Sequence, residues 1–252
     1  MVEIVNEIRL TLPCLPSARE DSMLPGPAPA ALEPTARMLI SLSRRFVFVA
    51  NVKTASTSIE AALRPHAEIA ISETRFGKHS GLAEIQDRFG FIFKKQPLES
   101  FFTFAVVREP LDMLVSVYSS HHKPEFKGER HYTGDLSFDE FLEAFRKRQS
   151  WQLVPQVQRL RDKTGQIRMD YVIDFDRLDT QFAEVVALLG LPPTPLPTHN
   201  ESPDVLSPAE VPEPTQAAIA EHYKRDRRIR RVLSGRWLRA PEAASPALGI
   251  AP

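Results

Sequence analysis

The chain contains a single cysteine, Cys14, which lies in a proline-rich stretch near the N-terminus. One cysteine cannot form an intramolecular disulfide, and it argues against a cysteine-based metal cluster and against thiol catalysis. A reducing compartment suits such a composition. We therefore expect an intracellular protein that uses no cysteine-bound metal.

The chain also lacks a net charge, because its 32 basic and 32 acidic residues cancel. A neutral balance gives no general attraction to nucleic acid or to an anionic membrane surface. Any anionic ligand must then be held by charges that are placed locally. We expect no nucleic-acid partner, and the search for a site turns to basic side chains at defined positions.

Long hydrophobic runs are absent as well, since none approaches the ~18 residues that a membrane-spanning helix needs. The N-terminus carries acidic residues among short apolar pieces, which differs from the basic-then-apolar pattern of a secretory signal. Hydrophobic residues make up 42% and charged residues 25% of the chain, as in soluble globular proteins. These features predict a cytoplasmic location.

Composition divides the chain into three parts. Residues 1–37 are rich in proline and predict an irregular N-terminal arm. Residues 236–252 are rich in alanine and proline and predict a flexible tail. The stretch between them, 38–235, is long enough for one sizeable core and predicts a single folded domain.

Apolar runs and amphipathic segments alternate within this domain. Short β-branched and aromatic runs predict central strands near 46–49, 101–107 and 169–175, with a lead-in at 38–42 and a short strand at 68–72. Helices are expected from residues 56 and 110, and over 137–148, 151–161, 178–189 and 207–226; loops are expected over 121–136 and 191–214. This order predicts an α/β fold in three layers, in which helices flank a central, mainly parallel sheet.

The stretch FVFVANVKTASTSI, residues 46–59, combines a buried strand, a polar loop and the start of a helix. Lys53 and the small residues that follow it stand where a helix presents its first amide groups, which favours an anion such as phosphate. The loop contains no glycine and is not the G-x-x-x-x-G-K loop of many nucleotide-binding proteins. An ordinary strand-to-helix turn with an exposed lysine is the alternative.

A second junction of this kind follows the strongest apolar run, FFTFAVV, at residues 101–107. Arg108 ends that strand, Pro110 opens a helix, and Ser116 lies two turns into the helix. Ligands of parallel α/β sheets bind beyond the carboxyl ends of the strands. We therefore expect Lys53 and Arg108 to lie on the same edge of the sheet.

Both junctions resemble known motifs. VKTASTSI resembles the 5′-phosphosulfate-binding loop of the sulfotransferases, and VVREPLDMLVSVY resembles their 3′-phosphate-binding segment, with a KHSG loop between them. MDYVIDFDRLDTQFAEVVALLGL followed by HNES is similar to the C-terminal half of the carbohydrate-type branch. The resemblance covers about residues 44–232. The chain departs from the family pattern at Val52 (usually proline), Glu109 (usually Asn or Asp) and Met113 (often arginine).

The resemblance implies a P-loop-like fold, the donor 3′-phosphoadenosine 5′-phosphosulfate (PAPS), the product 3′-phosphoadenosine 5′-phosphate (PAP), and no metal. It implies two anion cradles. The 5′-phosphate would be held by the loop after the first strand: Lys53, Thr54, Ala55, Ser56, Thr57 and Ser58. The 3′-phosphate would be held by Arg108, whose planar fork suits phosphate, and by Ser116. A structural salt bridge for Arg108 and a hydroxyl bonded to its own helix for Ser116 are the alternatives.

Transfer of a sulfuryl group to an alcohol needs a base, and His79 in the KHSG loop is the candidate because histidine titrates near neutral pH. Lys53 would act in catalysis by neutralising charge on the leaving oxygen. His121 and His122 are candidates for acceptor contacts, with solvated loop residues as the alternative; His199 is a weaker candidate. Several further positions fit the family pattern without a defined role: Asn200, Ser202, Tyr223, Asp226, and the arginines 227, 228, 230 and 231. Packing is the favoured role for Tyr223 and Asp226.

The predicted function is therefore transfer of a sulfuryl group from PAPS to a hydroxyl of a small-molecule or glycan acceptor, with a carbohydrate favoured by the branch that the chain resembles. Two alternatives stay open. One is a P-loop-type nucleotide phosphotransferase, although the G-K pair followed by a magnesium-binding Ser or Thr is missing. The other is a non-catalytic nucleotide-binding protein on the same fold. The sequence contains no pattern that predicts an oligomeric state.

Overall fold

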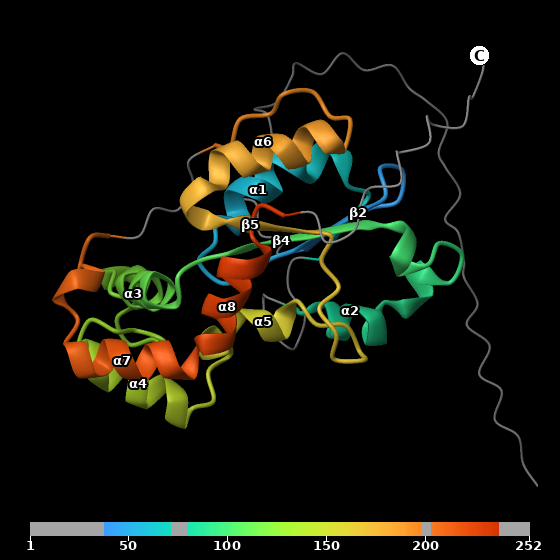
Figure 1. Ribbon diagram of the computed structural model, residues 1–252. Helices are drawn as coiled ribbons and strands as arrows, with labels where there is room; N and C mark the ends of the chain where they lie inside the picture. Colours follow the sequence, from blue (N-terminus) through green and yellow to red (C-terminus); the bar gives the residue numbers. More distant parts are fainter. Residues whose placement is uncertain (1–37, 72–79, 198–202, 237–252) are drawn as a thin grey trace, which may run out of the picture. The chain divides into compact units, whose positions relative to one another are not determined.

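The computed structural model describes residues 38–71, 80–197 and 203–236 (Figure 1). The predicted N-terminal arm and the tail beyond residue 236 lie outside these ranges. No helix within them is long and apolar enough to cross a membrane.

Five strands form one sheet in the order β3-β1-β2-β4-β5. Their bounds are β1 Met38–Ser41, β2 Phe46–Val49, β3 Ile69–Ile71, β4 Phe102–Val107 and β5 Tyr171–Asp174. The three central strands predicted from the apolar runs, β2, β4 and β5, pair in parallel. The predicted α/β fold with parallel core strands is confirmed.

The sheet is mixed because its outer half is antiparallel. β1 pairs antiparallel with both β2 and β3. A short turn joins β1 to β2, and Arg45 within it has a φ of 52°, so the chain reverses directly into the neighbouring strand. The lead-in expected at residues 38–42 is therefore a full member of the sheet.

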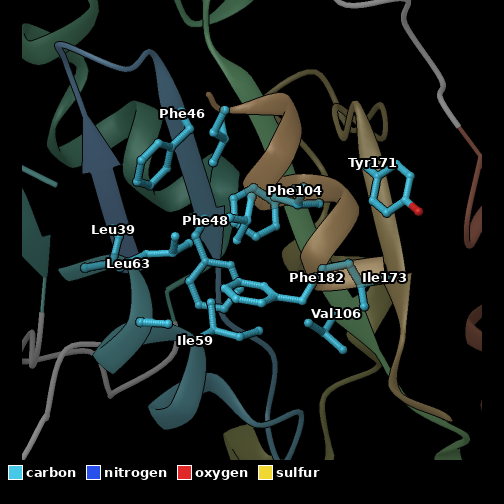
Figure 2. Packing of buried hydrophobic residues seen from close by; sticks show 14 of the residues in the cluster. Leu39, Phe46, Phe48, Ile59, Leu63, Phe104, Val106, Tyr171, Ile173 and Phe182 are labelled. Atoms are coloured by element: carbon cyan, nitrogen blue, oxygen red, sulfur yellow. The ribbon is translucent and has the colours of Figure 1, made fainter. Parts of the chain in front are cut away.

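Residues of the central strands alternate between two apolar clusters, which places helices on both faces of the sheet (Figure 1). Phe46, Phe48 and Phe104 face one cluster, together with Phe182 (Figure 2). That cluster is completed by α1, Ser56–Leu63, and α6, Leu178–Leu188. The other face packs against α2, Leu82–Arg88, α5, Gln156–Arg159, and α8, Lys224–Leu233. This is the expected three-layer arrangement.

A third apolar cluster joins helices beyond the carboxyl ends of the strands. It contains residues of α3, Pro110–Ser120, α4, Phe138–Lys147, and α7, Glu213–His222. Ser137 caps α4 in a reciprocal capping box with Glu140, as the sequence predicts for a helix that starts there. Short 3₁₀ turns connect the elements: η1 Arg64–His66, η2 Gly90–Phe93, η3 Leu98–Ser100, η4 Pro124–Phe126, η5 Trp151–Leu153, η6 Phe175–Arg177 and η7 Pro208–Glu210.

Two helix predictions were wrong in extent. The helix expected over 151–161 is a 3₁₀ turn followed by the four residues of α5, because Pro155 separates them. The single helix expected over 207–226 is η7 and α7, and a break at Tyr223 then starts α8. The basic run from residue 227 to 231 consequently lies inside α8 instead of following the last helix.

Candidate functional site

The loop between β2 and α1 is tied to the neighbouring strand by two buried side chains. Asn51 donates from Nδ2 to the carbonyl of Val106 in β4 over 2.8 Å. Thr54 donates from Oγ1 to the carbonyl of Asn51 over 3.0 Å, which closes the loop on itself. Both residues are fully buried. The loop is thus fixed at the carboxyl ends of β2 and β4.

The backbone of this loop has a left-handed conformation at two residues that flank Thr54. Lys53 and Ala55 both have a φ of 55°. Left-handed residues in such turns orient successive N–H groups into a concavity that binds anions. Ala55 also occupies the N-cap position of α1, and its methyl side chain cannot accept a hydrogen bond from the helix. The first-turn amides are therefore not capped by this residue, and they carry the positive end of the helix dipole.

Arg108 follows β4 and reaches the loop. Its Nη1 donates to the carbonyl of Lys53 over 3.1 Å, so the two cations predicted to share a sheet edge are brought together. The guanidinium carbon lies 4.2 Å from the centre of the Phe175 ring. Burial lowers the pKa of Arg108, and the nearby carboxylates of Asp112 and Asp176 act in the opposite direction.

Arg108 keeps donors for a further partner. Within the described residues its Nε is a buried donor without a hydrogen-bond partner. The structural salt bridge considered for this residue is not found in the same part of the chain, where the neighbouring Glu109 forms ion pairs and Arg108 forms none. A buried unpaired donor on a cation calls for an anion, since leaving it bare costs about 1–3 kcal/mol.

The other residues predicted to bind the donor follow Lys53 and Arg108 on α1 and α3. Ser56, Thr57 and Ser58 form the first turn of α1 and are buried. The hydroxyl of Thr54 is directed into the loop, as described above. Ser116 lies two turns beyond Arg108 on α3 and is 8% exposed.

Glu109, one of the departures from the family pattern, pairs with the basic run of α8. It lies 3.1 Å from Nε of Arg227 and 3.2 Å from Nη1 of Arg230. Arg230 also pairs with Asp174 over 2.9 Å and with Asp176. Two of the four arginines therefore attach α8 to the carboxyl ends of β4 and β5, whereas Arg228 and Arg231 are exposed.

The histidine candidates have different outcomes. His79 and His199 lie outside the described residues, as do Asn200 and Ser202. His121 is not a solvated loop residue: its Nδ1 lies 2.8 Å from the carbonyl of Val117 and its Nε2 lies 3.1 Å from Nε2 of Gln152. These partners require Nδ1 to donate and Nε2 to accept.

His122 packs against Tyr118, with 5.3 Å between the ring centres. The loop that carries both histidines also folds back onto α3, since Thr133 is buried and donates from Oγ1 to the carbonyl of Tyr118 over 2.7 Å.

Tyr223 and Asp226 hold the segment before and within α5. The Tyr223 hydroxyl donates to the carbonyl of Leu153 over 2.6 Å. Asp226 accepts from the amides of Gln156 and Val157 over 2.7 and 2.9 Å. Burial raises the pKa of Asp226, against the effect of these two amides. Both side chains thus make contacts within the fold, which agrees with the packing role expected for them.

Sequence reasoning missed Gln156 and Phe175, which both touch Arg108. Gln156 stands in no motif, and Phe175 lies in the family-like stretch that begins at Met169, where no role was assigned to it. Each reaches Arg108 only through the fold. A hollow of about 830 Å³ lies away from Lys53 and Arg108, and none of the residues predicted to bind the PAPS donor lines it. It is bordered by parts of α2, α5, α8 and the turn at residues 161–165. No group of three or more metal-ligating side chains occurs among the described residues.

A model described as "Sulfotransferase family" matches residues 37–234, which include every described element. No curated protein and no solved structure matches the chain.

Proposed function

The chain belongs to the sulfotransferase family, which implies a PAPS-dependent transferase, and we propose that it transfers the sulfuryl group to a hydroxyl of a carbohydrate. The observation that carries the proposal is the meeting of Lys53 and Arg108. The two residues follow different strands, and Nη1 of Arg108 donates to the backbone carbonyl of Lys53 over 3.1 Å. The arrangement suits a ligand with two separate anionic groups.

The residues present fit the donor at both ends. The loop of Lys53 and Ala55 has the left-handed backbone of an anion-binding concavity, and it leads into a helix whose N-cap residue, Ala55, has no side chain that could cap it. Arg108 has a buried Nε donor that lacks a partner within the described residues. We assign the 5′-phosphate to the loop with the first turn of α1, and the 3′-phosphate to Arg108 with Ser116.

The donor supplies an activated sulfuryl group, which leaves its 5′-phosphate oxygen as the acceptor oxygen bonds to sulfur. In the proposed mechanism, Lys53 and the loop amides neutralise the charge that develops on the leaving oxygen. The acceptor hydroxyl must lose its proton, and we assign that step to His79 on the basis of its place in the sequence. No metal ion takes part in these assignments.

Thr54 argues against the phosphotransferase alternative. In a P-loop, the hydroxyl residue after the lysine faces a magnesium ion. The Thr54 hydroxyl instead donates inside the loop and is fully buried. The loop thus offers amides and a lysine to a phosphate, without a hydroxyl placed for magnesium at that position.

The experiment that tests the proposal is a transfer screen with sulfate-labelled PAPS against sugars, phenols, lipids and peptides. We expect labelled product with a carbohydrate acceptor, and none from Lys53→Ala under the same conditions. Labelled phenol, lipid or peptide would correct the acceptor class. Tight binding of PAP without transfer to any of these acceptors would favour the non-catalytic alternative.

A further inference from the structure

We propose that Gln156 is a positioning residue that fixes the backbone of Arg108 and thereby aims its guanidinium at the 3′-phosphate. This inference rests on the proposed donor site. Gln156 is fully buried, although its side chain is polar. Its Oε1 accepts from the Arg108 amide over 2.9 Å, and its Nε2 donates to the Arg108 carbonyl over 2.8 Å. One side chain therefore satisfies both backbone groups of the phosphate-binding residue.

The orientation of the Gln156 amide follows from these partners. A backbone N–H can only donate and a carbonyl can only accept, so the oxygen and nitrogen of the side chain cannot be exchanged. Such a pair of bonds imitates one rung of a β-ladder at the point where β4 has ended. The backbone of Arg108 is held as if the strand continued, although α3 begins two residues later.

The guanidinium itself has few constraints of its own. Apart from the bond to the Lys53 carbonyl, the described contact is the face of Phe175, which restricts the plane of the group more than its position. An arginine side chain loses considerable rotamer freedom when it is ordered. When the backbone of Arg108 is already fixed, only its side-chain torsions remain to be ordered on ligand binding, so the entropic cost of binding is smaller.

Gln156 is in turn held by α8. The backbone N–H groups of Gln156 and Val157 both donate to Asp226, one to each carboxylate oxygen. This support is needed because α5 has only four residues, and so short a helix is not stable by itself. α5 and α8 pack side by side (Figure 1). The positioning path runs from Asp226 through Gln156 to Arg108.

A role limited to stability and a positioning role predict different binding behaviour. PAP and AMP differ only by the 3′-phosphate, so the ratio of their dissociation constants isolates the contact made by Arg108. Loss of the Gln156 side chain should weaken the binding of PAP and leave the binding of AMP nearly unchanged. The reason is that the 5′-phosphate, which both ligands carry, is assigned to the Lys53 loop. General damage to the fold would instead weaken the binding of both ligands to a similar extent.

The test measures PAP and AMP binding by calorimetry on the full chain carrying Gln156→Leu, which removes both bonds at similar volume. We expect the preference for PAP over AMP to fall about tenfold, as when charge-assisted hydrogen bonds are misaligned. Gln158→Leu is the matched control, because Gln158 lies on the same helix and is exposed. That variant should keep the wild-type preference.

A folded Gln156→Leu variant with the wild-type preference, or with equal losses for both ligands, would overturn the inference. If Gln156→Leu does not fold, Gln156→Asn decides in the same assay. Asparagine keeps a neutral amide but is one methylene shorter, so it cannot reach both backbone groups of Arg108, and the preference should again fall. A wild-type chain that binds PAP no better than AMP would instead refute the 3′-phosphate site, and with it the proposed function.

Discussion

Replacing Arg230 by methionine should destabilise the fold strongly, because this side chain joins α8 to three carboxylates. Arg230 is 19% exposed and pairs with Glu109, Asp174 and Asp176, whose side chains are 27%, 13% and 57% exposed. Burial acts to lower the pKa of Arg230, but the bonds and charges of Asp174 and Asp176 outweigh it and raise the pKa. The charged form is therefore stabilised by its surroundings.

The size of the effect follows from the exposure of the partners. Breaking a fully buried ion pair by removing one member costs about 3–5 kcal/mol, whereas an exposed pair contributes about 0–1 kcal/mol. The Arg230 cluster lies between these limits, since Asp174 is mostly buried and Asp176 is mostly exposed. We expect Arg230→Met to lower the free energy of unfolding by about 2–3 kcal/mol.

Arg227→Met is the matched control, because Arg227 pairs with a single carboxylate, that of Glu109, within the described residues and is 52% exposed. It should cost less than about 1 kcal/mol. Urea unfolding followed by circular dichroism at neutral pH gives the free energy of unfolding of both variants. Equal m-values would show that a shift in midpoint reflects stability and not a change in the compactness of either state. Equal losses for the two variants, or a loss below about 0.5 kcal/mol for Arg230→Met, would refute the reasoning.

Three further outcomes are expected. Lys53→Ala should reduce transfer by at least about 10²-fold with unfolding unchanged, because Ala55 shows that this loop accepts alanine at the same φ; wild-type turnover would refute the role. His79→Ala should lower turnover while the dissociation constant for PAP stays the same, and an unaltered rate would move the base elsewhere. Burial, aided by Asp226, raises the pKa of Tyr223 above its ordinary value of 10.0. As pH rises above 10, the unfolded chain releases this proton before the folded one, so wild-type stability should fall by up to about 1.4 kcal/mol per pH unit relative to Tyr223→Phe. Unfolding titrations of both proteins with the same pH dependence would contradict this.

Much of the fold could be predicted because its signals are local. β2 and α4 follow from an apolar run and from the Ser137 capping box. The break between α7 and α8 could not be predicted, because Tyr223 is neither glycine nor proline. The break instead coincides with the burial of the Tyr223 ring and its hydrogen bond to the carbonyl of Leu153, which are tertiary contacts. The antiparallel partner of β2 was also missed, since β1 reads equally as a lead-in.

The candidate site divides in the same way. The meeting of Lys53 and Arg108 was predicted from a topological rule, because parallel strands end at one edge of the sheet. Gln156 was not, since it lies 48 residues from Arg108 in the chain and its side chain reaches that residue only in the folded state. The left-handed loop was hidden too, because Lys53 and Ala55 occupy positions where glycine is the usual signal.

The central claim is that the chain holds PAPS between the Lys53 loop and Arg108. Calorimetric titration of the full chain with PAP, in the absence of magnesium, tests it most directly. We expect one PAP per chain, and Arg108→Ala should weaken binding at least about tenfold through loss of its charge-assisted hydrogen bonds. A wild-type chain that does not bind PAP, or an Arg108→Ala variant that binds it as tightly as wild type, would contradict the account.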